Sequence, residues 1–298
     1  MEKAEISILI PTYNNICVAL VSDLQKQAEA LGIDFEIIVA DDGSTDKETT
    51  AGNMAIQALP HCQYIIRQQN TGRACIRNFL AHEAQYAYVL FIDSDMTVKS
   101  ADFLKNYMTC SGNDVIDGGI SIAEESSNTK GNLRYEYEKA HRQLHEAAFR
   151  QKSPYHHLHT ANLMMRRDIV AAHPFDERFR HYGYEDVLFG KALKQNGIPI
   201  LHIDNPLGFD VFETNADFVA KTEEGLRTLH EFRNELRGYS NLLTLVNNLD
   251  HVIPTGLVRL WHRLMGAAER RHLCGSHPSL RIFNLYRLGY YLSITPKH

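Results

Sequence analysis

Short apolar runs alternate with amphipathic segments through the first third of this 298-residue chain. Four apolar runs predict strands, at residues 6–10, 36–40, 64–66 and 88–92. The segments between them, near 17–31, 46–58 and 73–85, predict helices. Strand–helix–strand alternation predicts an α/β fold, with a Rossmann-like, mostly parallel sheet flanked by helices and right-handed crossovers.

The alternation continues beyond residue 100, and its strands are expected to extend the same sheet. Further strands are expected near 115–122, 159–166 and 198–203, with helices near 132–150 and 185–196. From residue 216 onward the pattern is helical, with breaks at Gly238, Pro254 and 275–278. We therefore expect an α/β domain over 1–215 and a helical C-terminal extension over 216–298.

Two carboxylates follow the apolar run that ends at residue 92. Asp93 and Asp95 are two positions apart, and side chains at that spacing on a strand point the same way. We expect them to converge beyond the carboxyl end of the strand, where open α/β sheets hold ligands. Paired carboxylates suit Mg²⁺ or Mn²⁺ completed by phosphate oxygens. The alternative is a solvated turn, in which Asp and Ser are common.

The first two strands also run into polar segments, at 11–14 (Pro-Thr-Tyr-Asn) and 41–46 (Asp-Asp-Gly-Ser-Thr-Asp). Asp-Gly predicts a turn, with Ser44 or Thr45 capping the next helix. A carboxylate directly at a strand end also suits a base N–H or a ribose hydroxyl, and the ring of Tyr13 either packs or stacks on a base. In a parallel sheet these strand ends line one crevice.

Charged residues also open two predicted helices. Residues 70–73 (Asn-Thr-Gly-Arg) begin one helix, whose amino-terminal N–H groups attract phosphate, and Arg73 adds positive charge. Arg77, one turn later, either joins it or pairs with the acidic strand ends. Glu185 and Asp186 begin the second helix, either as capping carboxylates or as a general base for an attacking hydroxyl.

Composition narrows the class of protein. The net charge of −5 argues against a nucleic-acid partner. Residues 257–298 hold seven Lys or Arg and one Glu, about +6, so the rest carries about −11. Five scattered cysteines without C-x-x-C spacing indicate reduced thiols and a cytoplasmic location. No leader peptide and no uninterrupted apolar run long enough to span a bilayer is expected from the sequence.

Taken in order, five segments resemble the inverting nucleotide-sugar glycosyltransferase family often called family 2, which has the GT-A fold. They are 8–14, 41–46, 70–73, 93–95 and 182–186. The resemblance covers about residues 5–205 and implies a nucleotide half of about 1–100 and an acceptor half of about 101–215. Residues 161–186 also resemble a galactosyltransferase-like carboxyl half.

The resemblance implies a role for each matching residue. Pro11, Thr12, Tyr13 and Asp41 or Asp42 would form the uridine pocket, with Arg73 on the diphosphate. Asp93 would reach the ribose or the metal through water, Asp95 would bind the metal, and His202 would be a further ligand, with Asp210 as its competitor. Asp186 would be the catalytic base, and Glu185 would orient the acceptor.

The implied activity is a metal-dependent inverting transfer. Mn²⁺ or Mg²⁺ would hold a UDP-sugar, galactose types being favoured, and the acceptor would be a hydroxyl of a glycan or lipid-linked glycan. The alternative is an inactive nucleotide-sugar-binding or scaffolding protein of the same fold, which would be expected to lose the acids that are retained here. A nucleotidyltransferase needs a glycine-rich loop, which 11–15 lacks, and a dehydrogenase needs G-x-G-x-x-G.

Two further features invite interpretation. His156, His157 and His159 suggest zinc, but no Cys or paired acid accompanies them, which favours His157 and His159 beside the acceptor cleft or a sheet edge. In the basic tail, apolar residues at 257, 260, 261, 264 and 268 follow helical spacing with arginines around them. Such a helix either packs on this chain or on a second copy as a homodimer, or makes a peripheral contact through 257–298 at the inner face of the cell membrane.

Overall fold

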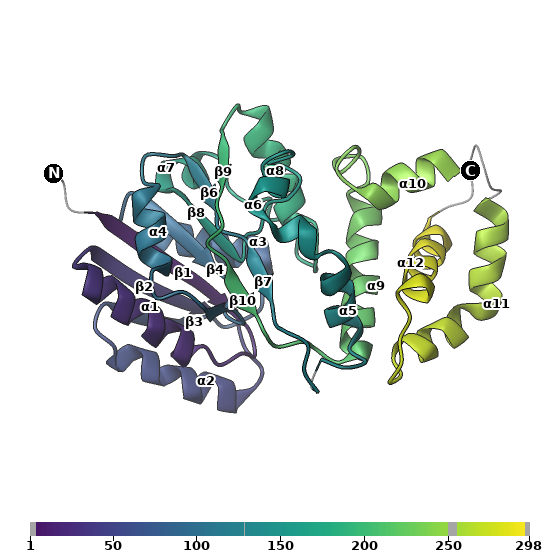
Figure 1. The fold of residues 1–298 in the computed structure, drawn as a ribbon, viewed down its shortest axis with the longest axis horizontal. Helices are drawn as coiled ribbons and strands as arrows, with labels where there is room; N and C mark the ends of the chain where they lie inside the picture. Colours follow the sequence, from purple (N-terminus) through teal and green to yellow (C-terminus); the bar gives the residue numbers. More distant parts are fainter. Residues whose placement is uncertain (1–3, 128, 250–254, 296–298) are drawn as a thin grey trace. The chain divides into compact units, whose positions relative to one another are not determined.

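The computed structural model describes residues 4–127, 129–249 and 255–295 (Figure 1). The chain divides into two compact units. The sheet unit contains the residues up to Ala123, Gln143–Arg180 and Glu185–Asp210; the helical unit contains Glu124–Arg142, His181–Tyr184 and the residues from Val211 onward.

Within the described residues, a seven-stranded sheet has the order β3-β2-β1-β4-β8-β6-β9. Its strands are β1 (Glu5–Thr12), β2 (Asp34–Asp41), β3 (Cys62–Ile66), β4 (Tyr88–Ile92), β6 (Val115–Asp117), β8 (Asn162–Arg166) and β9 (Ile200–His202). β8 runs antiparallel to β4 and β6, and the other pairings are parallel. The central strands are apolar on both faces, as is typical of a sheet covered by helices. The predicted mostly parallel α/β sheet is confirmed.

Helices flank this sheet (Figure 1). They are α1 (Val18–Leu31), α2 (Lys47–Asn53), the 3₁₀ helix η1 (Met54–Ala58), α3 (Arg73–Glu83), α4 (Phe103–Thr109), α7 (Arg167–Ala172) and α8 (Glu185–Gln195). α1 contacts α4, and α3 contacts α7. The strand order reverses after β3, so right-handed crossovers put α3 on the face opposite α1. The carboxyl ends of β1 and β4 adjoin at this switch point, where such sheets bind ligands.

The single strand predicted near 115–122 is wrong. The chain leaves the large sheet after Asp117, turns at Gly118 and Gly119, and continues as β7 (Ile120–Ile122). β7 forms a second sheet with β10 (Leu207–Phe209) and β5 (Thr97–Val98). The turn forms because the buried Asp117 carboxylate accepts a 2.7 Å hydrogen bond from the N–H of Gly119, whose φ is 75°.

The helix predicted near 132–150 is interrupted. It consists of α5 (Leu133–Ala140), the 3₁₀ helix η2 (Arg142–His145) and α6 (Ala147–Arg150). α6 ends on Arg150, whose guanidinium lies 2.9 Å from Asp117, and both side chains are fully buried. A buried charge requires a partner, so this pairing overrides the helical periodicity of the segment.

The helical unit is built from α5, α9 (Asn215–Glu231), α10 (Asn241–Leu249), α11 (Thr255–Leu273) and α12 (Leu280–Ile294). Leu133 of α5 packs with Phe218, Val219, Leu273 and Phe283. Because α5 belongs to this core, the unit begins before the boundary predicted at residue 215. The predicted breaks at Gly238 and 275–278 fall between helices, and Pro254 lies outside the described residues.

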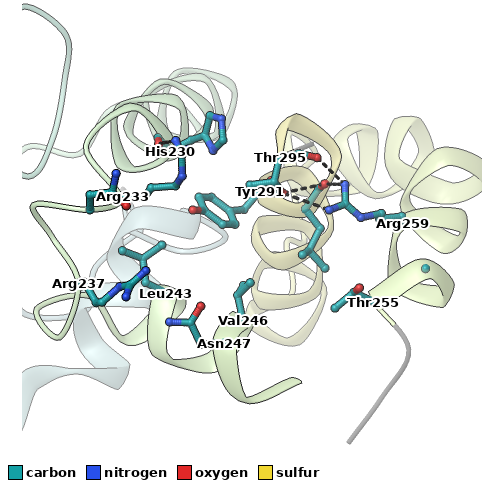
Figure 2. Close-up of a pocket in the computed structure, with 13 residues that line it drawn as sticks. His230, Arg233, Arg237, Leu243, Val246, Asn247, Thr255, Arg259, Tyr291 and Thr295 are labelled. Carbon is teal, nitrogen blue, oxygen red and sulfur yellow. Dashed lines mark hydrogen bonds between the residues drawn. The ribbon is translucent and has the colours of Figure 1, made fainter. Parts of the chain in front are cut away.

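A cavity of about 650 Å³ lies within the helical unit (Figure 2). Residues of α9, α10, α11 and α12 and of the segment between α9 and α10 line it, among them Arg233, Leu243, Arg259 and Tyr291. Arg259 donates to the backbone carbonyls of Leu292 and Thr295 at the end of α12. None of the predicted site residues is among the described residues that line this cavity.

Across the described ranges, none of the helices combines the length and apolarity needed to cross a lipid bilayer.

Candidate active site

Asp41 closes the turn after β2. It lies beside Thr12 at the end of β1 in the parallel register and is fully buried. One carboxylate oxygen accepts a 2.6 Å hydrogen bond from the N–H of Ser44, and the other accepts one of 2.6 Å from the hydroxyl of Tyr64. Asp41 therefore uses both oxygens to hold its own loop, and its contact with uridine stays a prediction.

Asp42 fixes the entry to α3. Its carboxylate accepts hydrogen bonds from the N–H groups of Thr71 and Gly72, at 3.0 and 2.9 Å, and lies 3.3 Å from Arg67. Gly72 has φ of 92°, and a Cβ there would lie 2.9 Å from the carbonyl oxygen of Arg180. Glycine is thus required at this position, and Asp42 holds the amino end of α3 in place.

Asn14 joins the loops after β1 and β2. Its side-chain oxygen accepts hydrogen bonds from the N–H groups of Thr45 and Asp46, at 2.9 and 3.0 Å. The predicted cap of the following helix is corrected: Asp46, rather than Ser44 or Thr45, accepts from the N–H of Glu48 and caps α2. The asparagine bridge leaves the neighbouring Tyr13 ring 45% exposed at this edge of the sheet.

The remaining residues of this edge lie within β1. Pro11 pairs with Ala40, and Thr12 is buried with its hydroxyl donating to the carbonyl of Asn15. Pro11, Thr12 and Tyr13 therefore follow one another at the carboxyl end of β1, which is the position predicted for the uridine pocket.

Asp93 and Asp95 lie in a turn. β4 ends at Ile92, and the N–H of Met96 donates to the carbonyl of Asp93 at 3.1 Å. The predicted strand alternation therefore does not orient the two carboxylates, because the strand has already ended. Asn15 anchors the turn by donating to the carbonyl of Ser94 at 2.8 Å. Asp95 is exposed at its tip.

Arg77 joins the end of β4 to the start of α8. Its guanidinium donates to Asp93 at 2.7 Å and to Glu185 at 3.3 Å, and only 1% of its side chain is exposed. Arg73 lies one turn earlier on the same face of α3, 4.0 Å from Asp93 and 3.9 Å from Glu185. Half of the Arg73 side chain is exposed. The pairing alternative for Arg77 is confirmed.

The two arginines set the charge of Asp93. Burial alone would raise the pKa of Asp93, but the guanidiniums of Arg77 and Arg73 outweigh burial and hold that pKa below its ordinary value. Asp93 is therefore ionised at neutral pH, beside cationic groups.

Asp186 is an unusually basic carboxylate. Burial, and then the neighbouring charge of Glu185, raise the pKa of Asp186 to about 6. The N–H of Val187 donates to it at 2.7 Å and works in the opposite direction. With that pKa, Asp186 is mostly ionised at pH 7 and is a much stronger base than an ordinary aspartate.

Asn78 and Phe175 lock the elements that carry these groups. The Asn78 side chain accepts from the N–H of Phe175 and donates to its carbonyl, both at 2.9 Å. The Phe175 ring stacks on Phe189 of α8 at 4.2 Å and meets Phe91 of β4 edge-on at 5.7 Å. Sequence reasoning gave Asn78 no role, since pairing with a distant backbone leaves no local signal.

His202 lies in a different cluster from Asp93 and Asp95. One ring nitrogen accepts from Arg150 at 2.7 Å, and the other donates to the carbonyl of Pro154 at 3.0 Å. Burial lowers the pKa of His202, so the ring is neutral. The predicted ligand role would require His202 to give up at least one of these hydrogen bonds, because a metal ligand uses one ring nitrogen. Its competitor, Asp210, pairs with Lys99.

His159 belongs to the same buried cluster as His202. The backbone N–H of His159 donates to the carboxylate of Asp117 at 2.8 Å, and the Nδ1 atom of its ring lies 3.4 Å from the same carboxylate. Among the described residues, no three Asp, Glu, His or Cys side chains gather in positions that could hold a metal ion. The Asp117–Arg150 pair was missed, because its partners are distant in sequence.

The switch point thus carries ionised and basic carboxylates, two arginines and an exposed aromatic ring, all around the ends of β1 and β4 and the starts of α3 and α8. This is the architecture of a GT-A type α/β transferase.

The family model for glycosyl transferase family 2 matches residues 7–173, more than half of the chain. The chain belongs to this family, and the resemblance noted from the motifs is confirmed. The match ends at residue 173, so the galactosyltransferase-like character of the carboxyl half stays a prediction.

A curated relative is similar to most of this chain. Chondroitin synthase of Pasteurella multocida is 25% identical over 237 residues, which cover 68% of this chain and 24% of that protein. The chain therefore spans about a quarter of this relative.

Two solved structures share the fold. S. aureus TarS 1-349 in complex with UDP-GlcNAc is 16% identical, with a TM-score of 0.53 over 97% of this chain and 90% of that one. The mannosyltransferase PcManGT of Pyrobaculum calidifontis, in complex with GDP-Man and Mn²⁺, is 13% identical, with a TM-score of 0.59 over 96% and 84%.

Proposed function

We propose that this chain is a metal-dependent inverting glycosyltransferase that moves a sugar from a UDP-sugar to a hydroxyl of a glycan or lipid-linked glycan. The observation that carries the proposal is the Arg77 bridge. It holds Asp93, on the donor side, and Glu185, the neighbour of the basic Asp186, within one guanidinium's reach. Donor and acceptor chemistry thereby share one rigid centre.

Asp186 acts as the general base. Its pKa of about 6 leaves it ionised at neutral pH and able to accept the proton of the acceptor hydroxyl. The hydroxyl oxygen then bonds to the anomeric carbon while the bond from that carbon to the diphosphate breaks on the opposite face. This single displacement inverts the anomeric centre. Glu185, held by Arg77, orients the acceptor.

The donor binds along α3 and the end of β1. Arg73 is half exposed at the first turn of α3, where the helix N–H groups and its guanidinium favour the diphosphate. Pro11, Thr12 and the exposed Tyr13 ring contact the uracil and ribose. Asp41 and Asp42 shape this pocket through the loops that they hold. UDP is the proposed nucleotide, and the UDP-GlcNAc complex of TarS supports it.

The carboxylates fit a divalent cation. Asp95 is exposed and Asp93 is ionised, and Mg²⁺ or Mn²⁺ is commonly held by one or two carboxylates together with substrate phosphates. When bound, the ion neutralises the leaving diphosphate as a Lewis acid. We assign Asp95 as the direct ligand and Asp93 as a ligand through water. His202 would join them only after giving up its hydrogen bond with Arg150 or with Pro154.

The setting is proposed from chemistry and relatives. Chondroitin synthase makes polysaccharide assembly the favoured context. The five free cysteines suit a reducing cytoplasm. A homodimer stays a prediction.

A donor panel tests the proposal. The full chain is incubated with UDP-linked hexoses and N-acetylhexosamines and with GDP-mannose, each with Mn²⁺, Mg²⁺ or chelator, and released nucleoside diphosphate is measured. We expect release of UDP only with a cation and at most a trace in Asp186→Asn. Turnover of GDP-mannose alone would overturn the UDP assignment, and turnover in chelator would overturn the metal assignment.

A further inference from the structure

Helix α11 carries an apolar stripe that the described residues leave uncovered. Leu257, Leu260, Trp261 and Leu264 follow the spacing of one helix face and are 61, 51, 47 and 71% exposed. The opposite face of α11 packs inside the helical unit, where Leu273 is fully buried. The helix is therefore anchored on one side and apolar on the other.

The exposed stripe belongs to α11, whereas α12 exposes the single large apolar side chain of Leu285, at 38%, among its described residues. The sequence shows a similar apolar spacing in both helices, but Tyr291 and Leu292 of α12 are 1 and 2% exposed. They pack inside the helical unit, and Tyr291 lines its cavity (Figure 2). The surface proposed within 257–298 is thereby narrowed to one helix face.

The arginines of α11 and α12 divide into two sets. Three of them bind within the helical unit. Arg259 donates to a carbonyl at the end of α12, Arg270 pairs with Glu223, and Arg287 lies over the Phe283 ring. The other three, Arg263, Arg271 and Arg281, are exposed and form no ion pair with another described residue. The one acid of these helices, Glu269, is buried.

We infer that α11 lies flat in the interface of an anionic lipid bilayer, with its stripe among the lipid chains and its free arginines on the head-group phosphates. A second copy of the chain fits less well. A two-fold interface would bring the same arginines face to face, and these helices offer no exposed acid to pair with them. An anionic lipid surface would take up the apolar stripe and would also pair with the exposed arginines.

Trp261 suits this location. Tryptophan favours the membrane interface, where its ring is apolar and its N–H finds a polar partner. Here the indole N–H donates to Glu269 at 2.7 Å, which satisfies the polar atom within the protein and leaves the ring half exposed.

The experiment uses Trp261 as its own probe, because it is the one tryptophan of the chain. The full chain is titrated with vesicles of phosphatidylcholine, or of phosphatidylcholine mixed with phosphatidylglycerol, and Trp261 emission and co-sedimentation are measured. With anionic vesicles, we expect a blue shift and quenching by lipids brominated on the acyl chain. Neutral vesicles should give neither.

Variants separate the contribution of the apolar stripe from that of the exposed arginines. Leu264→Glu should abolish the shift. Arg263→Gln with Arg271→Gln should weaken partition about 25-fold, since each basic residue near an anionic surface contributes about fivefold. Met54→Glu is the matched control, because Met54 is an exposed apolar side chain of the sheet unit, at 45%. It should bind as the native chain does.

Three results would overturn the inference. They are equal partition into neutral and anionic vesicles, no response of Trp261 to either, and a lipid-free blue shift that grows with protein concentration and disappears in Leu264→Glu. The last result would assign the stripe to a second copy of the chain. The readout needs no donor, so it stands or fails separately from the proposed transferase activity.

Discussion

Two groups of arginines, one in the sheet unit and one in the helical unit, differ in burial and in their partners. In the sheet unit, Arg77 and Arg150 are buried, and each lies against carboxylates: Arg77 against Asp93 and Glu185, and Arg150 against Asp117. On α11 and α12 of the helical unit, three arginines are exposed beside apolar side chains and form no ion pair with another described residue.

The difference follows from the cost of removing charge from water. A buried ion costs several kcal/mol unless its partners are well placed, so Arg77 and Arg150 dictate where their carboxylates lie. An exposed arginine costs little and remains available to a partner outside the chain. The buried arginines therefore position the carboxylates around them, whereas the exposed arginines leave a basic surface available to an outside partner.

The largest effect is expected at the site. Asp186→Asn keeps the shape of the side chain but cannot take a proton, so turnover should fall roughly 10²- to 10⁴-fold while UDP affinity is retained. Steady-state kinetics and calorimetry measure the two quantities. Asp168→Asn, an exposed carboxylate paired with Arg166, is the matched control. Retention of more than about a tenth of native turnover would exclude Asp186 as the base.

Removing the bridge tests the buried side of the comparison. Arg77→Met leaves Asp93 and Glu185 without their cation, so the free energy of unfolding should fall by about 3–5 kcal/mol. Urea denaturation measures it. Arg73→Met, whose native side chain is half exposed, should cost about 1 kcal/mol or less. Equal losses in the two variants would show that Arg77 does not fix the site.

Asp95→Ala should weaken UDP binding in Mn²⁺ by roughly tenfold or more if Asp95 is the direct ligand proposed above. The fold should be unaffected, since Asp95 is exposed. Calorimetry with Mn²⁺ and with chelator separates the metal from the nucleotide, and Asp102→Ala on the surface serves as the control. Unchanged affinity in both solutions would remove the metal assignment.

The raised pKa of Asp186, about 6, has two consequences for pH. Below that pH, kcat/KM should fall about tenfold per unit, as the base becomes protonated. The free energy of unfolding changes in the opposite direction and rises as the pH falls. Asp186 binds its proton more tightly in the folded state than in the unfolded chain, where the pKa of an aspartate is about 3.9. The stabilisation is present below about pH 4 and is lost as pH rises through about 6.

The Asp186→Asn variant has no carboxylate to ionise at this position and so keeps its stability as the pH rises. At pH 8 its free energy of unfolding should exceed that of the native chain by on the order of 1–3 kcal/mol. Near pH 3 the two proteins should converge. Denaturation at both pH values checks it. A variant that is less stable at pH 8 would contradict the raised pKa.

The smallest effect is expected on the exposed stripe. Leu264→Glu should change the free energy of unfolding by no more than about 0.5 kcal/mol, because the side chain is already in water. Phe283→Ala, in the core of the same unit, should cost about 3–5 kcal/mol. A large loss in Leu264→Glu would mean that the stripe is covered in solution.

Local pattern was enough for the elements in the first third of the chain. The strands and helices up to residue 92 follow from apolar runs, because a strand covered on both faces must be apolar throughout. The turn at Gly43 and the helix starts at Arg73 and Glu185 also follow from residues close to them in sequence. The residues proposed for the site therefore lie at the ends of elements that local pattern places, and their roles in the reaction stay predictions.

Contacts between distant residues decided the rest. Nothing near Arg77 indicates that it joins Asp93 to Glu185, and nothing near Arg150 indicates that it ends a helix on Asp117. These pairings depend on which elements become neighbours, and the free energy of buried charge then overrides local preference.

The sequence by itself determined the alternation of strands and helices, the polar residues at their ends and the excess of arginine in the tail. The tertiary structure decided which of these groups are buried. α11 and α12 have similar apolar periodicity, yet Leu264 lies in solvent and Leu292 in the core. Periodicity fixes which residues share a face, and only the packing of neighbouring helices fixes which face is removed from water.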